Sequence, residues 1–185
     1  MAPKPKVGHC PPPPSIEKFT FLAPASPSSK RHLFLSSIDI HWRDLHYNKR
    51  LLFYPNITTT TTYHDAIHTL KTSLSIVLVD YFPWAGRLAL DSQGRLIIDC
   101  NNAGVEFVEA SLEFRMSEIS QEGFPMMPLY ESLSRPVDHT GDRLYTSPLL
   151  SIQVHWNLNQ WDLPSWTPHH NTIHERSNAY VSIRW

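Results

Sequence analysis

Between residues 64 and 99 the hydrophobic pattern changes from a helical period to a strand period, and this change most constrains the fold. Apolar side chains first recur at steps of three and four residues, as on one face of an amphipathic helix, at Ile67, Leu70, Leu74, Val77, Leu78 and Tyr81. Pro83 ends that pattern, and two β-rich runs, 87–91 and 95–99, then flank Gly94. We therefore predict a helix over about 64–82 beside a β-hairpin, in a mixed α/β fold.

The rest of the chain up to residue 154 supports further strands. Apolar and β-branched residues predict strands at 16–22, 51–55, 105–108 and 149–154. The run 33–42 is apolar but interrupted by Ser36-Ser37, which indicates a buried segment with a polar bend. Thr62 with Asp65 three residues later is typical of a helix start. A short helix could occupy 111–121, and 123–148 is rich in loop residues.

Composition excludes several classes of protein. Lys plus Arg is 16 and Asp plus Glu is 17, so the chain lacks the basic surface that nucleic acids or anionic lipids attract. Two cysteines, Cys10 and Cys100, cannot form a disulfide framework or a cysteine-built zinc site. No apolar run approaches the roughly 18 residues of a membrane span. We predict a cytoplasmic protein with no membrane, nucleic-acid or metal partner.

The chain divides into three regions of different amino-acid composition. Residues 1–15 are basic and proline-rich, and we expect them to be disordered. Residues 16–154 carry the periodic segments of a folded lobe. In 155–185 there are four of the six tryptophans and four of the eleven histidines, but no glycine and no lysine. We expect this tail to be poorly ordered.

An ordered series of motifs resembles the N-terminal lobe of the plant BAHD acyltransferases. The most specific is the block from Tyr81 to Leu88, Tyr-Phe-Pro-Trp-Ala-Gly-Arg-Leu. The others, in chain order, are Leu35-Ser-Ser-Ile-Asp39, Leu52-Phe-Tyr54, Leu70-Lys-Thr-Ser-Leu74, the Gly94 hairpin, Gly104-Val-Glu-Phe107 and Ser147-Pro-Leu-Leu-Ser-Ile-Gln-Val154. The resemblance implies a chloramphenicol-acetyltransferase-like α/β lobe with a mixed sheet and packed helices, incomplete in this chain.

The resemblance also implies a reaction. An acyl group would pass from acyl-CoA, a co-substrate rather than a bound cofactor, to a hydroxyl or amine of a plant secondary metabolite. In that family the histidine of a His-x-x-x-Asp motif is the general base, the CoA site lies between two lobes, and members are usually monomeric. No histidine of this chain has aspartate four residues later, and no Asp-Phe-Gly-Trp-Gly motif is present. We therefore assign no catalytic residue and expect this chain, lacking the second lobe, to be inactive alone.

The unusual tail suggests a specific origin. The family runs through a glycine-rich stretch at this point, and glycine codons preceded by T encode tryptophan in a shifted reading frame. Here glycine is absent, and tryptophans stand at five-residue intervals at Trp156, Trp161 and Trp166. We hypothesise a frameshift or an unspliced intron near residue 155. Genomic DNA without a frame that restores the glycines and His-x-x-x-Asp would exclude it.

Candidate site residues are few. Ser37, Asp39 and His41 are the best candidates for substrate contacts, because the resemblance places this region beside the acceptor pocket; a structural or surface role is the favoured alternative. Arg87 is expected to be structural, and Gly86 to adopt a conformation that other residues resist. Two histidine groups have spacings that suit a metal, but another explanation is favoured for each. His64 and His68 are expected on the exposed entry face of the helix, and His169, His170 and His174 are expected to be chance histidines of an out-of-frame or disordered tail.

Two other functions stay open. A Ser/His/Asp hydrolase would show Gly-x-Ser-x-Gly, and this chain has no glycine pair at that spacing. The non-enzymatic alternative is a fragment that binds or interferes with full-length relatives. An uncovered lobe interface also predicts poor solubility and weakly cooperative unfolding. In the folded lobe we expect Leu70, Leu74, Val77 and Leu78 to be buried against 95–99 and 149–154, each truncation to Ala costing about 2–5 kcal/mol.

Overall fold

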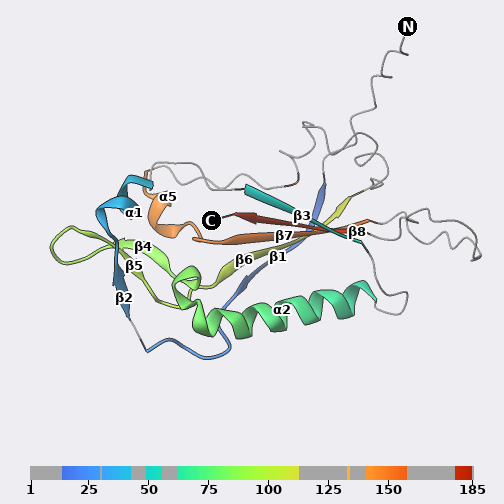
Figure 1. Ribbon diagram of the computed structural model, residues 1–185, viewed down its shortest axis with the longest axis horizontal. Coiled ribbons are helices and arrows are strands. Elements are labelled where there is room, and N and C mark those ends of the chain that lie inside the picture. The colour runs from blue at the N-terminus through green and yellow to red at the C-terminus, as the bar shows by residue number, and fades with distance from the viewer. Residues whose placement is uncertain are drawn as a thin grey trace, which may run out of the picture.

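The computed structural model describes residues 14–29, 31–42, 49–55, 62–112, 133, 141–157 and 178–184. Within them, two sheets form the framework (Figure 1). The larger sheet has the strand order β1-β6-β7-β8-β3, with the bounds β1 Ser15–Leu22, β6 Val105–Leu112, β7 Ser151–Asn157, β8 Asn178–Arg184 and β3 Lys49–Pro55. The smaller sheet has the order β2-β5-β4, with the bounds β2 His32–Phe34, β5 Leu96–Asp99 and β4 Arg87–Leu90.

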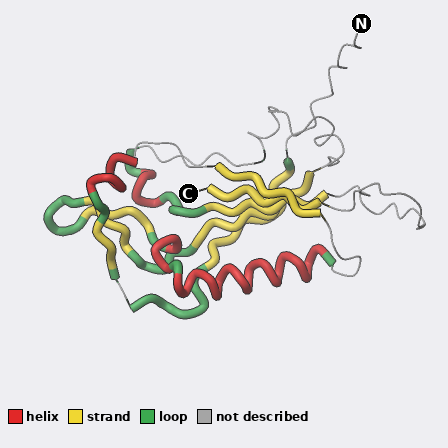
Figure 2. Tube along the Cα trace, viewed as in Figure 1, coloured by secondary structure: helices red, strands yellow, loops and turns green. Residues whose placement is uncertain are grey.

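Helical segments are fewer than strands among the described residues (Figure 2). The long helix α2 spans Tyr63–Asp80 and runs along the larger sheet. Three short ones complete the set: α1 (Ser37–Trp42), the 3-10 turn η1 (Phe82–Ala85) and α5 (Arg143–Thr146). No described helix is both long and apolar enough to cross a membrane.

The larger sheet is mixed, which confirms the predicted fold class. Strands β6 and β7 pair in parallel at its centre, whereas the β1–β6, β7–β8 and β8–β3 pairs are antiparallel. All eight residues of β6 are buried, as expected for a central strand with both faces covered. The core of the lobe therefore lies on β6 and β7.

The start and end of α2 follow the sequence signals. Thr62 is the N-cap, and its Oγ1 accepts the backbone N–H of Asp65 at 3.2 Å while its hydroxyl donates to the Asp65 carboxylate at 2.6 Å. At the other end Pro83 lies in η1, because proline at the start of a new turn needs no backbone donor.

The buried face of α2 is narrower than predicted. Ile67 and Leu78 are buried and Leu74 is partly buried, and they pack against Phe107 and Val105 of β6, Val154 and Ile152 of β7, and Leu22 of β1. Strand 149–154 was thus the right partner, but 95–99 was wrong because β5 belongs to the smaller sheet. Leu70 and Val77 are exposed, since the helix turn places them beside the row formed by Ile67, Leu74 and Leu78.

The smaller sheet contains the predicted hairpin. Strands β4 and β5 pair from Arg87↔Asp99 to Leu90↔Leu96, and Gly94 has a φ of 74° in the connection. The run 33–42, predicted as one buried segment, instead ends β2 and then forms α1. Ile38 and Ile40 of α1 are exposed, so this part of the run is not buried.

The ends of the lobe also differ from the predicted boundaries of 16 and 154. Strand β1 begins at Ser15 and β7 continues to Asn157. Strand β8 lies within the tail 155–185, and the expected poor order of that tail stays a prediction. The run Tyr180-Val-Ser-Ile183 has the β-branched and aromatic residues that favour strands, and it pairs between β7 and β3. Residues 1–13, 113–121 and 158–177 lie outside the described residues.

Candidate functional site

The aromatic-Pro-Trp-Ala-Gly-Arg block lies where the two sheets meet. It comprises η1, Gly86 and the first residue of β4, and the Gly104 N–H before β6 donates to the Ala85 carbonyl at 2.9 Å. Gly86 has extended backbone with a φ of −88°, so the prediction that it needs an unusual conformation is wrong. A Cβ there would lie 2.5 Å from the Asp99 carbonyl oxygen, so space is what requires glycine.

Arg87 stabilises the junction between the two sheets, which agrees with its predicted structural role. Its guanidinium is buried and donates from Nη1 to the carbonyls of Gly86 at 2.7 Å and Gly104 at 2.8 Å. It also lies over the ring of Phe21 on β1, 5.3 Å from the ring centre. The buried cation thus has acceptors in the residues just before β4 and just before β6, and it holds β4 against the β1–β6 edge.

The three predicted substrate residues lie together on α1. Asp39 and Ser36 form a reciprocal pair: the Ser36 N–H donates to the Asp39 carboxylate at 2.8 Å, and the Asp39 N–H donates to Ser36 Oγ at 3.2 Å. The Ser36 side chain and, second, the Ser36 backbone N–H lower the pKa of the Asp39 carboxyl by hydrogen bonding to it. Ser37 is exposed at the first position of α1, and the side chain of His41 lies outside the described residues. The Asp39 carboxylate thus caps α1, whereas substrate contact by the three stays a prediction.

Strand β7 contains a buried histidine, a residue type that can act as a general base. His155 is 0% exposed, and its Nε2 lies 2.7 Å from the Leu133 carbonyl oxygen. Because a carbonyl can only accept, Nε2 carries the proton, and Nδ1 keeps a lone pair with no hydrogen-bond partner among the described residues. Burial lowers the pKa of His155, and the bond to Leu133 only partly opposes that effect.

The same features limit what His155 can do. A neutral imidazole with a free lone pair is the form a general base needs. However, no reactant can reach a nitrogen whose side chain has no exposed surface. The residue four positions later is Asn159, so the orienting aspartate of a His-x-x-x-Asp motif is missing from the sequence. His155 is therefore a core residue in this structure.

A charged cluster that no sequence signal predicts lies between α2 and the sheet. Lys71 Nζ lies 2.5 Å from Glu109 Oε1 and 5.2 Å from the Phe107 ring centre, and the Tyr63 hydroxyl donates to Glu109 at 3.1 Å. Burial raises the pKa of Glu109, but Lys71 and the Tyr63 hydroxyl more than offset it and leave it below the usual value. Burial and the nearby carboxylate raise the pKa of Tyr63. The cluster fixes the helix on the sheet.

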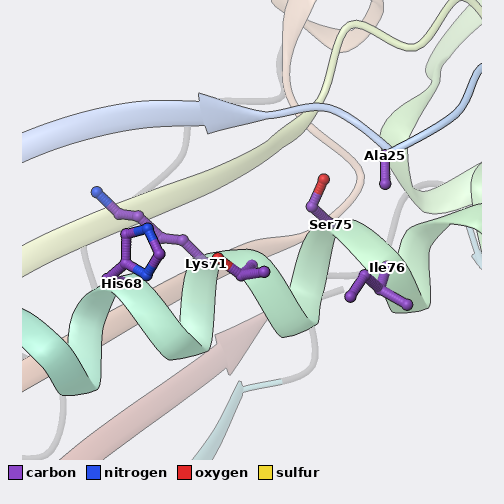
Figure 3. A pocket seen from close by; sticks show the side chains of 6 residues that line it. Ala25, His68, Lys71, Ser75 and Ile76 are labelled. Carbon is purple, nitrogen blue, oxygen red and sulfur yellow. The ribbon is translucent and has the colours of Figure 1, made fainter.

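A shallow depression lies beside α2 and is bordered by Lys71 of this cluster (Figure 3). It has a volume of about 340 Å³ and is lined by Ala25, His68, Lys71, Thr72, Ser75 and Ile76. Its polar groups are largely used within the fold: Ser75 Oγ donates to the Ala23 carbonyl at 2.8 Å, and Lys71 pairs with Glu109. His64 and His68 have no third metal-binding side chain near them in the described part of the chain. His169, His170 and His174 lie outside it.

These features define a class of protein: a mixed α/β lobe whose two sheets are joined through a buried arginine. A family model described as Transferase family matches residues 15–156. The hydroxycinnamoyltransferase of Narcissus pseudonarcissus is 32% identical over 157 residues, which is 84% of this chain and 35% of that protein. The benzyl alcohol O-benzoyltransferase of Petunia hybrida is 32% identical over 72% of this chain and 28% of its own length.

A solved structure has the same fold: the crystal structure of vinorine synthase superposes with a TM-score of 0.61 at 20% identity, covering 92% of this chain and 37% of that one. By the family match and its relatives, the chain belongs to the plant BAHD acyltransferase family and corresponds to the N-terminal region of its members. It spans about a third of the length of the curated relatives it matches.

Proposed function

We propose that this chain is the N-terminal lobe of an acyltransferase that moves an acyl group from acyl-CoA to a hydroxyl or amine of a plant secondary metabolite. The supporting observation is the match of residues 15–156 to the family, together with relatives named for hydroxycinnamoyl transfer and for benzoyl transfer to benzyl alcohol. In the reaction a base takes the acceptor's proton, the acceptor atom bonds to the thioester carbonyl carbon, and the C–S bond breaks. The CoA sulfur then takes the proton.

We also propose that these 185 residues do not catalyse this transfer alone. Their only histidine on β7, His155, is enclosed and has no aspartate partner in the sequence motif. General-base catalysis contributes about 10²–10⁴-fold, and positioning of two reactants contributes about 7–11 kcal/mol. We therefore expect the described part of this lobe to supply neither an accessible base nor both walls of a binding tunnel.

An acyl-transfer assay tests both statements. The purified chain is incubated with acetyl-, malonyl-, hydroxycinnamoyl- and fatty-acyl-CoA and with alcohol, phenol and amine acceptors, and products are detected by mass. The Narcissus hydroxycinnamoyltransferase serves as the active control. We expect no product above the uncatalysed rate. Turnover that survives His155→Ala, His169→Ala and His170→Ala would overturn the proposed mechanism, and loss of turnover in one of them would identify a base in the tail.

A second candidate is a non-catalytic fragment that binds or interferes with full-length relatives. Its support is the large exposed apolar side chains of α2, Leu70, Ile76, Val77 and Val79. A pull-down with a full-length relative tests this candidate. Co-purification of the relative with this chain would support it, and no co-purification would exclude it. The cytoplasmic location, the monomeric state and the absence of nucleic-acid and membrane partners stay predictions.

A further inference from the structure

The segment that follows β1 is attached to α2 at two points. Ser75 Oγ donates to the Ala23 carbonyl at 2.8 Å, and the Ala25 N–H donates to the Ser75 carbonyl, also at 2.8 Å (Figure 3). None of residues 23–29, which we call the strap, is in a helix or a strand. The path of the strap beside α2 is therefore set by Ala23 and Ala25.

The strap contains a serine between two prolines, in the sequence Pro24-Ala-Ser-Pro27. Proline has no backbone N–H and fixes its own φ at about −65°. It also biases the residue before it away from helical backbone. This stretch therefore cannot continue a helix or supply a regular row of strand donors, so it stays available to a partner that binds a proline-containing segment.

Ser26 is open to solvent on this segment. Both Ser26 and Pro27 are exposed, and Ala25 and Ser26 form a bend that no hydrogen-bonded turn closes. The Ser26 hydroxyl has no hydrogen-bond partner in the described part of the chain. An enzyme can therefore enclose this hydroxyl, and straighten the bend, without first breaking a bond that Ser26 makes.

The chain contains a second Ser-Pro pair, Ser147-Pro148, and its surroundings are the opposite. Ser147 is only 9% exposed, and Pro148 is buried as well. The Ser147 N–H donates to the Arg143 carbonyl at 2.9 Å, which ends the short helix α5. Two residues before Ser147 stands Tyr145, where the strap has proline. The fold therefore separates two sites that share one dipeptide.

We propose that Ser26 is a phosphorylation site for a proline-directed serine/threonine kinase that recognises proline two residues before and one residue after the serine. In the reaction Ser26 Oγ bonds to the γ-phosphorus of Mg²⁺-ATP, the bond from that phosphorus to the β–γ bridging oxygen breaks, and ADP leaves. An aspartate of the kinase accepts the hydroxyl proton. The product is a phosphoserine with a charge of about −1.5 to −2 at pH 7.

The phosphate leaves the attachment of the strap intact. The bonds to Ser75 come from the Ala23 carbonyl and the Ala25 N–H, and the Ser26 hydroxyl takes no part in them. We therefore expect the phosphorylated chain to keep its fold. The kinase reaction uses no catalytic group of this chain, so the result of the acyl-transfer assay neither supports nor excludes it.

The test incubates the full 185-residue chain with a mitogen-activated protein kinase and Mg²⁺-ATP. Mass spectrometry after protease digestion measures the rate of phosphate incorporation at each site separately, so Thr167-Pro168, the third such pair in the sequence, does not enter the comparison. A synthetic peptide of residues 20–32 gives the rate at Ser26 without the fold. Ser147 is the internal control for a buried site.

We expect Ser26 in the folded chain to be phosphorylated within 3-fold of the rate in its peptide, and Ser147 at least 10-fold more slowly than Ser26. Pro27→Ala should lower the rate at Ser26 at least 10-fold, because it removes the proline that the kinase recognises. Ser29→Ala, also at an exposed position of the strap, is the matched control and should change the rate less than 2-fold. Circular dichroism confirms that both variants are folded.

Three results would overturn the proposal. The first is no phosphate on Ser26, or a rate at least 10-fold below that of the peptide, because the strap would then be inaccessible. The second is an equal effect of Pro27→Ala and Ser29→Ala, because proline would then not direct the reaction. The third is phosphorylation of Ser147 as fast as Ser26, because the kinase would then act on unfolded chain.

Discussion

At the scale of single residues, Gly86 shows how a lack of space can determine residue identity. Its extended backbone is open to any residue, but a Cβ would lie 2.5 Å from the Asp99 carbonyl oxygen and 3.1 Å from the Ile98 side chain. Because one of these neighbours is backbone of β5, relief requires a shift of the hairpin. The family block therefore depends on a contact between η1 and the smaller sheet.

We expect Gly86→Ala to lower the free energy of unfolding by about 1–3 kcal/mol. Gly94→Asn is the matched control, because Gly94 has a φ of 74° with nothing within 4 Å of its Cβ position, and Asn tolerates this conformation. Its effect should stay within about 0.5 kcal/mol. Urea denaturation of the three proteins measures the difference, and equal effects of the two substitutions would contradict the steric argument.

His155 predicts a pH dependence of stability. Burial holds its pKa below that of an unfolded histidine, so between the two values the unfolded chain binds a proton that the folded chain does not. Stability from the neutral His155 is therefore complete above about pH 6.5 and is lost as the pH falls below it, by at most about 1.4 kcal/mol per pH unit. The Glu109 carboxyl, whose pKa is lowered, acts in a separate and more acidic range.

Urea unfolding between pH 7 and pH 5 measures this slope. His155→Gln, which keeps a donor for the Leu133 carbonyl, should flatten the profile, whereas His64→Gln on the exposed side of α2 should retain it. A wild-type profile that is flat over this range, or unchanged in His155→Gln, would contradict the assignment of the titration to the buried ring.

At the scale of elements, α2 separates two kinds of leucine that look alike in the sequence. Leu78 is buried against Ala85 and Val105, whereas Leu70 is exposed. We expect Leu78→Ala to cost about 2–5 kcal/mol because it leaves a cavity. Leu70→Ala should cost less than about 1 kcal/mol, since no core surrounds it. Thermal and urea unfolding test the pair, and equal costs would mean that an unseen partner buries Leu70.

This contrast explains which parts of the fold the sequence predicts. Local signals specify single elements: Thr62 and Asp65 start α2, Pro83 ends it, and Gly94 marks the hairpin. The side of α2 that is buried and the sheet that each strand joins depend on residues distant in the chain. For this reason the expected packing of α2 against 95–99 is wrong. Only the family resemblance located the block that contains Gly86 and Arg87, and nothing in local periodicity reveals the Lys71–Glu109 pair.

At the scale of the whole molecule, the candidate site is limited by how the lobe is assembled. The Tyr81–Leu88 block joins the two sheets, α1 is capped by Ser36 and Asp39, and the buried face of β7 holds His155. Each of these polar groups has a structural task in the described part of the chain. The exposed apolar side chains are a second property of the lobe at this scale.

That surface includes the edge strand β1. A register shift between Ile16 and Lys18 aligns Ile16 with Ala110, while Phe19 aligns with Val108 and Phe21 with Glu106. Three large apolar side chains therefore share one face, opposite α2, on a strand that pairs on one side only in the described sheet. Exposed apolar edges promote pairing with other chains.

We expect the purified chain to associate as its concentration rises and to unfold with weak cooperativity. Phe19→Lys should reduce the association, measured by light scattering, because a charge on an edge strand opposes pairing. Ile38→Lys on the exposed face of α1 is the control and should leave it unchanged. Both substitutions should preserve the circular dichroism spectrum. A wild-type chain that stays monomeric and melts in one sharp transition would contradict the prediction, because its exposed apolar surface would then be compatible with a self-sufficient domain.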